Sequence, residues 1–352
     1  MRVIDLPDVQ AFVVIDHELF PVSAGGTRML PDVRIEEVAR LARAMTWKFA
    51  ACRVPCAGAK AGLRFADGDR AEALAAYKRA LEPYRDVFLT GPDMGTFPGD
   101  FLDDWDGPPP LWAKTHEGLG MDDLATGHGV KAAAEAGLAH LGRSLNGAAV
   151  AIEGFGKVGA GTARACARAG ARVVGVSTVD GLLADLDGLD VEELLALREL
   201  HGDRFVAHSP RPVHPREELF ELDCDVLVPG ARPDSITANV ARQVRCAVVA
   251  PAANIPYGPG AVEVLDGRGV LAIADFVANS GAVYLYDIVS HDSQPEAALA
   301  AIEAGVREAV ARTLATSDEL GITPLAGAFR EARDYLAEAT GAPREVLDEL
   351  FA

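Results

Sequence analysis

Residues 147–170, which read GAAVAIEGFGKVGAGTARACARAG, decide the fold. An apolar, strand-like run leads into Gly154, Gly156 and Gly159, and an alanine-rich helical segment follows. This order is typical of a dinucleotide-binding βαβ unit. The first glycine permits a tight turn, the second lets a pyrophosphate approach the backbone, and the third lets the helix lie close to the strand. The first turn of the helix, with Lys157 and Val158, offers N–H groups to phosphates.

Apolar strand-like runs recur at residues 171–177, 224–230, 246–254 and 270–279, and helical segments separate them. Strands alternating with helices predict a doubly wound parallel sheet. We therefore predict an α/β protein of two domains. Residues 126–324 form a Rossmann dinucleotide-binding domain, and residues 1–125 form an α/β substrate domain that a C-terminal helix at about 325–352 completes.

The substrate domain shows its own pattern of elements. A strand is predicted within residues 11–20, a helix with an apolar stripe within 33–54, a second helix at about 70–84 and a short strand at 86–93. Two further helices are predicted at about 295–318 and 325–340.

Composition narrows the class of function. The chain has 33 Lys and Arg against 52 Asp and Glu, a formal charge of -19 without a basic stripe. That balance argues against nucleic acid and anionic membranes as partners. The first residues lack an apolar signal core, and no run is long enough to span a membrane, so we expect a cytoplasmic protein. The five cysteines lack paired metal-ligand spacing and are expected to be buried free thiols, with no metal bound.

The end of the second Rossmann strand bears on the choice of dinucleotide. Ser177 or Thr178 stands where an acidic residue is expected, and the nearest carboxylate is Asp180. Residues 176–191 contain no Lys or Arg. A ribose phosphate would meet acids there, so NAD is favoured and NADP stays possible. A basic residue arriving from elsewhere in the fold would reverse that preference.

Lys60 lies in VPCAGAKAGLRF, residues 54–65, among alanines and glycines. One interpretation is a solvated charge on a tight turn. The other is functional: small neighbours let backbone and substrate come close, while partial burial and a second cation lower the pKa of the ammonium toward neutrality.

Seven segments together decide between these interpretations. They are SAGGTRML (23–30), AMTWKFAACRVPCAGAKAGL (44–63), LTGPDMGT (89–96), ATGHGV (125–130), GFGKVG (154–159), VAPAANIP (249–256) and DFVANSGAV (275–283). In this order they resemble the glutamate, leucine, phenylalanine and valine dehydrogenase superfamily of amino-acid dehydrogenases. Taken singly, Asp93, Asn254 and Asn279 could each simply cap a turn. Taken together and in this order, the segments favour the family.

The resemblance implies a role for each matching residue. Lys48 would hold the substrate α-carboxylate and lower the pKa of Lys60, which would activate water and polarise the keto oxygen. Asp93 would carry protons to and from the amino nitrogen. The other implied substrate contacts are Gly26, Ala24, Met45, Asn279, Val283 and Tyr286, and the implied cofactor contacts are Thr126, Gly154, Gly156, Lys157, Val158, Gly159, Thr178, Asp180, Ala231 and Asn254.

The reaction that the resemblance implies is reversible NAD(P)-dependent oxidative deamination of an L-amino acid to a 2-oxo acid and ammonia, in a homo-oligomer. Glutamate-using members carry a lysine where this chain has Ala24 and a serine where it has Tyr286. We therefore expect a non-acidic substrate, bulky and apolar or aromatic, and a chain closer to the phenylalanine and leucine members.

Departures from the family pattern leave alternatives open. Ala57 and Ala59 replace glycines before Lys60 and are expected to crowd a turn, and Lys157 replaces an asparagine. One alternative is an oxidoreductase of this fold for an unusual amino acid or amine of a specialised pathway. Another is a non-catalytic NAD-sensing paralogue, against which the retention of Lys48, Lys60 and Asp93 argues.

Overall fold

The computed structural model describes residues 1–102, 108–290 and 292–351, which form two compact units. Unit 1 comprises Met1–Ala113 and Ala332–Ala352, and unit 2 comprises Lys114–Glu331. The predicted class, α/β with two domains, is confirmed. The divisions lie before helix α3 (Met121–His140) and within helix α11 (Pro324–Thr340), whereas we placed them near residues 125 and 324. The first shift has a simple reason: residue 126 lies inside the continuous helix α3, which packs within unit 2.

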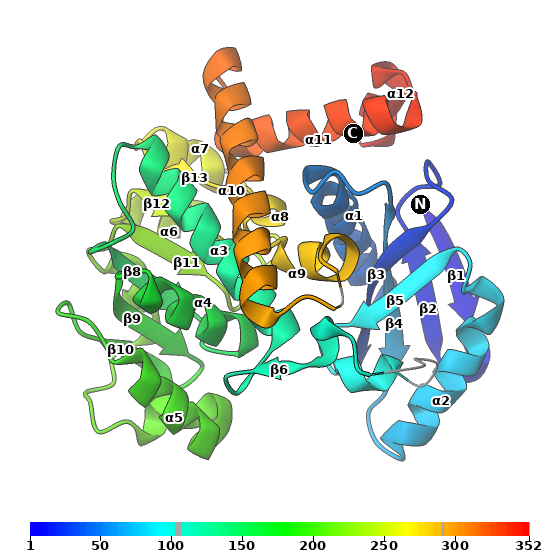
Figure 1. Ribbon diagram of the computed structural model, residues 1–352, viewed down its shortest axis with the longest axis horizontal. Helices are drawn as coiled ribbons and strands as arrows, with labels where there is room; N and C mark the ends of the chain where they lie inside the picture. The colour runs from blue at the N-terminus through cyan, green and yellow to red at the C-terminus, as the bar shows by residue number, and fades with distance from the viewer. Residues whose placement is uncertain (103–107, 291, 352) are drawn as a thin grey trace. The chain divides into compact units, whose positions relative to one another are not determined.

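Unit 1 is built on a five-stranded mixed sheet of order β1-β2-β4-β3-β5 (Figure 1). Its strands are β1 (Arg2–Leu6), β2 (Ala11–Ile15), β3 (Ser23–Leu30), β4 (Ala57–Arg64) and β5 (Phe88–Pro92). β3 runs parallel to β4 and β5, and β2 runs antiparallel to β1 and β4. The helices are α1 (Ile35–Ala51), α2 (Arg70–Leu81) and, at the C-terminus, α12 (Arg344–Leu350).

The two faces of this sheet follow the alternation along β2. Phe12 and Val14 pack with Val38 and Ala42 of α1. Val13 and Ile15, on the other face, belong to a cluster with Leu74, Tyr77 and Leu81 of α2. Because side chains alternate along a strand, one helix covers each face. The apolar stripe predicted for residues 33–54 is thus confirmed as α1.

The segment around Lys60 is a strand inside the sheet, so the tight turn that we considered there is wrong. Two glycines near Lys60, Gly58 of β4 and Gly25 of β3, leave no room for a side chain. A Cβ on Gly58 would lie 2.2 Å from Ala42 O, and a Cβ on Gly25 would lie 1.7 Å from Ala59 O. Ala57 and Ala59 are buried strand residues outside the positive-φ set, so their methyl groups do not strain a turn.

Unit 2 contains a six-stranded sheet of order β10-β9-β8-β11-β12-β13, parallel except for the antiparallel edge strand β10. The strands are β8 (Ala149–Glu153), β9 (Arg172–Thr178), β10 (Gly181–Ala184), β11 (Val226–Pro229), β12 (Val248–Val249) and β13 (Leu271–Ala272). The helices are α3, α4 (Lys157–Arg168), α5 (Val191–His201), α6 (Ala238–Gln243), α7 (Ala261–Asp266), α8 (Asp275–Ala278), α9 (Gly281–Val283) and α10 (Pro295–Leu320), and a π-helix, η7, spans Tyr284–Ile288. A small hairpin of β6 (Thr115–His116) and β7 (Leu119–Gly120) precedes α3.

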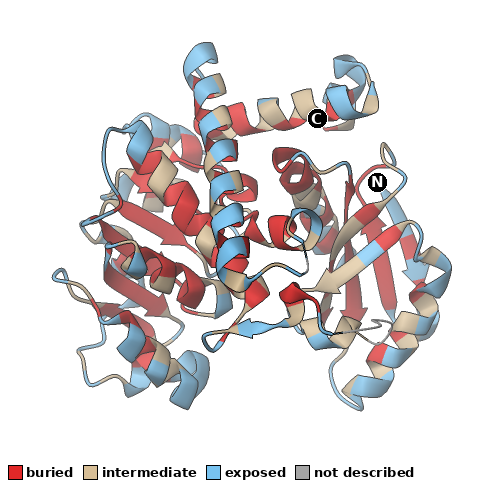
Figure 2. Ribbon diagram, viewed as in Figure 1, coloured by how far each residue is buried: buried red, intermediate tan, exposed pale blue. Residues whose placement is uncertain are grey.

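The predicted Rossmann strands are present, with one correction. Every residue of β8 and β11 is buried, as a sheet covered on both faces requires, and Figure 2 shows these central strands in the buried colour. The run 270–279, which we read as a strand, is β13 followed by helix α8. Apolar content alone does not separate a short buried strand from a buried helix.

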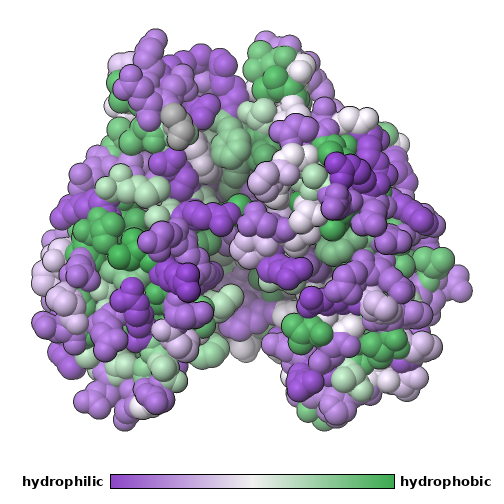
Figure 3. All heavy atoms as spheres, turned by 180° about the vertical axis from the view of Figure 1, so that it is seen from behind, coloured by the Kyte–Doolittle hydropathy of each residue, from purple (hydrophilic) through white to green (hydrophobic). Residues whose placement is uncertain are grey.

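The surface shows mainly hydrophilic residues on the face that Figure 3 draws, with apolar residues scattered among them. Within the described residues, no helix has the length and apolar character that crossing a membrane requires. In that same part of the chain, no cluster of three or more His, Cys, Asp and Glu side chains is arranged to hold a metal ion.

Gly58→Ala tests the close approach of α1 to β4. The added methyl would meet the backbone of Ala42 and Thr46 at 2.2 Å, so the substitution should destabilise unit 1 by about 1–3 kcal/mol. Calorimetry should show a lower midpoint temperature. Gly99→Ala is the matched control, because a Cβ there meets nothing within 4 Å. Equal effects of the two substitutions would contradict this packing.

Candidate functional site

In unit 1 the structure brings Lys60 and Asp93 into direct contact. Lys60 Nζ lies 3.2 Å from Asp93 Oδ2, and the two side chains are 8% and 20% exposed. Lys60 points from the middle of β4, while Asp93 follows the end of β5, on the other side of β3. The pair is therefore assembled across three neighbouring strands.

Gly26 of β3 is the residue that leaves space between them. A Cβ there would lie 3.1 Å from Lys60 Nζ and 2.9 Å from Asp93 Cβ. Gly26 also pairs with Gly91 of β5, where a Cβ would meet nothing within 4 Å. A Cβ on Gly26 would also lie 2.5 Å from Pro92 O, so only a glycine lets the two charged side chains meet there, while open space lies beside Gly91 of the adjacent strand.

Arg28 holds the carboxylate in place, a role that we did not predict. Its Nε donates a hydrogen bond of 3.0 Å to Asp93 Oδ2, and its guanidinium also contacts Glu37 of α1. Burial acts to raise the pKa of Asp93, but Lys60 and Arg28 outweigh it and lower the pKa. Asp93 is therefore a carboxylate in the ligand-free protein. Arg28 lies two residues beyond Gly26 on the same strand face, and that alternation was the available signal.

A threonine fixes the backbone that carries Asp93. Thr96 Oγ1 accepts a hydrogen bond from Asp93 N at 2.8 Å and donates one to Thr27 O at 2.8 Å. Thr96 is buried, so this turn is tied to β3 from inside. The tie sets the direction in which the Asp93 side chain leaves the strand end.

The other predicted residues of unit 1 lie on neighbouring elements. Lys48 is a buried residue of α1, the helix that packs on β4, and Met45 lies one turn earlier on α1. Ala24 pairs with Gly58 across β3 and β4. Lys60 contacts the carboxylate of Asp93, and our expectation that the ammonium of Lys48 acts on Lys60 stays a prediction.

In unit 2 the three fingerprint glycines have the geometry that dinucleotide binding needs. Gly154 has a φ of +84°, and a Cβ on Gly159 would lie 2.0 Å from Gly154 O, so the helix lies against the strand end. A Cβ on Gly156 would meet nothing within 4 Å, so the backbone there is open to a ligand. Lys157 and Val158 begin α4, and the first turn of a helix is a favourable place for a phosphate.

Glu153, at the end of β8, ties this loop to the one that holds Ala231. A Cβ on Gly154 would come within 3.3 Å of Ala231 Cα, and Ala231 N donates to Glu153 Oε2 at 3.4 Å. Burial raises the pKa of Glu153. The structure thus brings the predicted cofactor residues Gly154 and Ala231 together.

The two asparagine segments are joined directly. Asn279 Nδ2 donates to Ala252 O, to Ala253 O and, at 3.2 Å, to Asn254 Oδ1. Asn279 is 2% exposed. We predicted a substrate contact for Asn279, and in this structure its amide nitrogen shapes the loop that presents Asn254.

Thr126, Val283 and Tyr286 lie close to one another in the fold of unit 2. Thr126 Oγ1 donates to Asp122 O within α3, and a Cβ on Gly281, at the start of α9, would lie 1.9 Å from Ala125 O. Val283 ends α9, and Tyr286 lies in the π-helix that follows it. The segment that begins at Asn279 therefore rests on the part of α3 that holds Thr126.

Acidic groups surround the start of α3. Burial, together with the neighbouring Asp122, raises the pKa of Asp123 to about 7, and Lys157 opposes this rise. Burial also raises the pKa of Tyr286, and the nearby carboxylates of Asp122 and Asp123 act in the same direction. The sequence gives no simple signal for this cluster, because Lys157 and Tyr286 are far along the chain from the adjacent Asp122 and Asp123.

A basic residue does arrive beside the end of β9. Arg204 donates to both carboxylate oxygens of Asp180, at 3.1 and 3.3 Å. The Asp180 side chain is 13% exposed and that of Arg204 is 76% exposed. Asp180 N in turn donates to Thr178 Oγ1 at 3.2 Å. The acids expected at this position are thus accompanied by a cation from outside residues 176–191.

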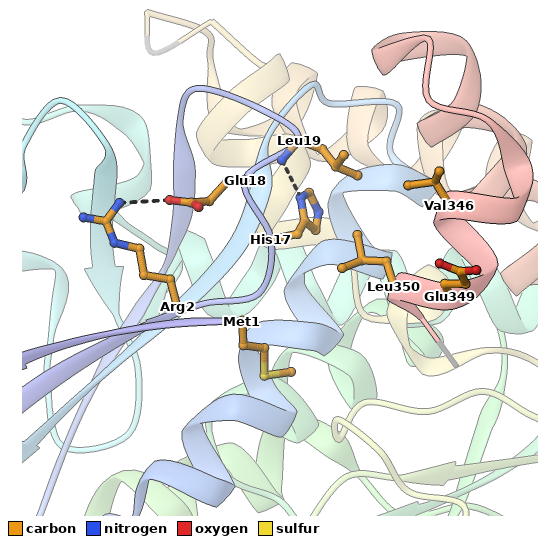
Figure 4. A pocket seen from close by; sticks show the side chains of 8 residues that line it. All are labelled: Met1, Arg2, His17, Glu18, Leu19, Val346, Glu349 and Leu350. Carbon is orange, nitrogen blue, oxygen red and sulfur yellow. Dashed lines mark hydrogen bonds and ion pairs between the residues drawn. The ribbon is translucent and has the colours of Figure 1, made fainter.

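A surface pocket elsewhere in unit 1 lies apart from these residues. It is lined by Met1, Arg2, His17, Glu18, Leu19, Val346, Glu349 and Leu350, as Figure 4 shows. His17 Nδ1 accepts a hydrogen bond from Leu19 N, and Arg2 pairs with Glu18. None of the predicted site residues lines this pocket.

α3 is anchored by Glu303 of α10. Glu303 contacts His128 Nδ1 at 2.7 Å and Lys131 Nζ at 3.0 Å. Burial acts to raise the pKa of Glu303, but the hydrogen bonds from His128 and Lys131 outweigh it and bring the pKa to about 2. The ion pairs thereby fix the helix that carries Thr126.

Two family descriptions match this chain. Residues 7–101 match the Glu/Leu/Phe/Val dehydrogenase dimerisation domain, and residues 118–342 match the Glutamate/Leucine/Phenylalanine/Valine dehydrogenase domain. Glutamate dehydrogenase A2 of Halobacterium salinarum is 35% identical over 279 residues, and the NAD-specific glutamate dehydrogenase of Staphylococcus aureus is 34% identical over 277. Each match covers 74% of this chain and 66% of the relative, just under two thirds of its length.

Solved structures give the same answer for the fold. The hetero-hexameric glutamate dehydrogenase of Thermus thermophilus, in its Leu-bound form, superposes with a TM-score of 0.81 at 27% identity, covering 96% of this chain and 88% of that one. L-tryptophan dehydrogenase of Nostoc punctiforme gives a TM-score of 0.66 at 23% identity, covering 97% of both chains. The similarity to the tryptophan dehydrogenase shows a shared fold and nothing further.

Glu303→Gln tests the anchoring of α3. Because the folded pKa of about 2 lies below the ordinary 4.5, the carboxylate stabilises the fold above about pH 4.5, and this contribution is lost as pH falls toward 2. The variant should therefore be less stable at pH 7, by about 2 kcal/mol, and the gap should narrow in acid. Thermal unfolding across pH measures this. Glu308→Gln, at an exposed pair with Arg312, should change little; a pH-independent gap for Glu303→Gln would contradict the assignment.

Proposed function

Because the chain belongs to the Glu/Leu/Phe/Val dehydrogenase family, we propose that it catalyses the reversible NAD-dependent oxidative deamination of a non-acidic L-amino acid to the 2-oxo acid and ammonia. The observation that carries this proposal is the contact of Lys60 Nζ with Asp93 Oδ2 beside the bare backbone of Gly26. An ammonium and a carboxylate in contact are a pair suited to proton transfer at an amino acid's nitrogen and at the water that attacks its α-carbon.

In the proposed mechanism each residue handles one proton or one charge. Lys48 holds the α-carboxylate, and Asp93 accepts a proton from the substrate ammonium. Bound NAD, which Gly154, Gly156 and the start of α4 would hold, would supply the acceptor for the α-hydrogen, transferred as hydride. Lys60, as the neutral amine, removes a proton from the water that attacks the resulting iminium carbon. Lys60 passes this proton to solvent. Asp93 then returns its proton to the amino nitrogen, Lys60 takes the hydroxyl proton of the adduct, the C–N bond breaks as the C=O bond forms, and ammonia leaves.

Charge near Tyr286 supports a non-acidic substrate. Asp122, Asp123 and Asp287 all act electrostatically on Tyr286, the residue that replaces a family serine. A substrate carboxylate placed near Tyr286 would meet negative charge. Independently of this, the chain has Ala24 where glutamate-using members of the family carry a lysine. The glutamate dehydrogenase names of the relatives do not support the closeness to phenylalanine and leucine members that we expected. A bulky apolar or aromatic substrate remains a prediction, and an unusual amino acid or amine remains the alternative.

Lys60→Ala tests the catalytic assignment. Loss of the base should lower kcat/KM for deamination by about 10²- to 10⁴-fold. Reduction of NAD with a panel of amino acids measures this, and NADH binding, followed by its fluorescence, should be unchanged. Lys78→Ala, on the outer helix α2, is the control and should keep full activity. Tight NADH binding without turnover of any amino acid by the wild type would favour a cofactor-sensing protein instead.

We propose that Asp180 receives the adenosine ribose hydroxyls and that Arg204 orients it. The two hydrogen bonds from Arg204 hold the carboxylate at the end of β9, and an S. aureus relative is NAD-specific by name. Asp180→Ala should therefore reduce the NAD over NADP preference in kcat/KM by about tenfold. Parallel assays with both cofactors measure it. A wild-type preference for NADP that Arg204→Ala abolishes would reverse the roles of the two residues.

We further propose that the protein is a homo-oligomer, because residues 7–101 match a dimerisation domain. Sedimentation or light scattering at several concentrations tests this proposal.

A further inference from the structure

Two of the five cysteines, Cys224 and Cys246, lie side by side in unit 2. Asp223 forms an isolated parallel β-bridge with Arg245, and Val226 of β11 pairs with Val248 of β12. The residue numbers in each pair differ by 22 (245 − 223 and 248 − 226), and Cys224 and Cys246, which differ by the same number, lie between these pairs. Cys224 N also donates to Arg245 O at 3.2 Å. The two residues therefore occupy facing positions where the chain enters the parallel strands β11 and β12.

The two cysteines share the same surroundings. Both border the same apolar cluster of unit 2, and Cys246 acts to raise the pKa of Cys224. Both are partly exposed, so our expectation of five buried thiols is wrong for this pair, whereas Cys52, Cys56 and Cys166 are buried. The fold therefore does not enclose these two residues completely.

We propose that Cys224 and Cys246 form a reversible disulfide, a redox modification site in the nucleotide-binding unit. Facing residues of adjacent strands are separated by about 4.8 Å, within the about 4.4–6.8 Å that disulfides span between Cα atoms. Exposed disulfides are easier to reduce than buried ones, and both cysteines are partly exposed, so we expect a dithiol to reduce the bond.

The reaction balances with a peroxide as oxidant. The sulfur of one cysteine, as thiolate, attacks the O–O bond of hydrogen peroxide, and a sulfenic acid and one water result. The second sulfur then attacks the first, the S–S bond forms, the S–O bond breaks, and a second water leaves. Two thiols and one peroxide thus give one disulfide and two waters, and a dithiol reductant reverses the change.

The surroundings make this reaction slow and confine its effect. Cys246 and burial raise the pKa of Cys224, and the carboxylates of Asp225 and Asp223 add to the rise, so thiolate is scarce. The cysteines precede β11 and β12, whereas the loops with Ala231 and Asn254 follow these strands. The cross-link therefore forms at the amino-terminal ends of these strands, whereas the proposed cofactor residues lie at their carboxyl-terminal ends.

Thiol counting after peroxide treatment tests the proposal. The full chain is incubated with hydrogen peroxide for hours, then denatured and alkylated, and intact mass is measured. Alkylated thiols should fall from five to three, with one disulfide. Trypsin cuts after Arg242 and Arg245, so the two cysteines should appear in one cross-linked peptide pair that dithiothreitol separates.

Two single substitutions serve as controls, Cys224→Ser and Cys246→Ser. Each variant has four thiols, and after treatment it should show either four alkylated thiols or three alkylated thiols and one irreversibly oxidised, with no cross-link. Cys166→Ser removes a thiol of α4, and this variant should still lose two alkylatable thiols. NADH binding should be equal before and after oxidation. Five alkylatable thiols after treatment, or oxidation of Cys224 and Cys246 to sulfinic acids without a cross-link, would overturn the proposal. Both outcomes are independent of the amino-acid chemistry proposed above.

Discussion

The residues of unit 1 that we propose as catalytic depend on one constraint: the backbones of α1, β3 and β4 lie too close together for side chains at Gly25 and Gly58. This close approach makes the sheet continuous beside Lys60, so the lysine projects from a strand held on both sides. Gly26 then leaves the gap through which Lys60 and Asp93 meet. A lysine on a loose turn would have no fixed partner, and its ammonium would be solvated.

Charge balance around Asp93 gives the site its ligand-free state. Lys60 and Arg28 keep the carboxylate ionised despite burial, and Glu37 balances the arginine. Breaking such a pair by removing one partner leaves a buried charge, which costs about 3–5 kcal/mol, so these residues support folding as well as chemistry. Substrate charges that enter this set would redistribute the protons, and that redistribution is the chemistry proposed.

The sequence predicts the Rossmann unit well because its signals are local: a glycine loop between strand and helix, with alternating apolar runs. The contacts that the sequence does not predict join residues that are far apart along the chain. Arg204 reaches Asp180 from a different segment, and Arg28 reaches Asp93 across strands, so neither pair is visible in a window of sequence. Composition also did not distinguish a strand from a turn around Lys60, or a helix from a strand at residues 275–278.

A crystal structure of the protein with a 2-oxo acid and NADH tests the central claim most directly. The account predicts electron density for the oxo acid beside Gly26, with Lys60 Nζ within hydrogen-bond distance of the keto oxygen and Asp93 on the same side of the ligand. Density for the oxo acid at a site remote from both side chains would contradict it.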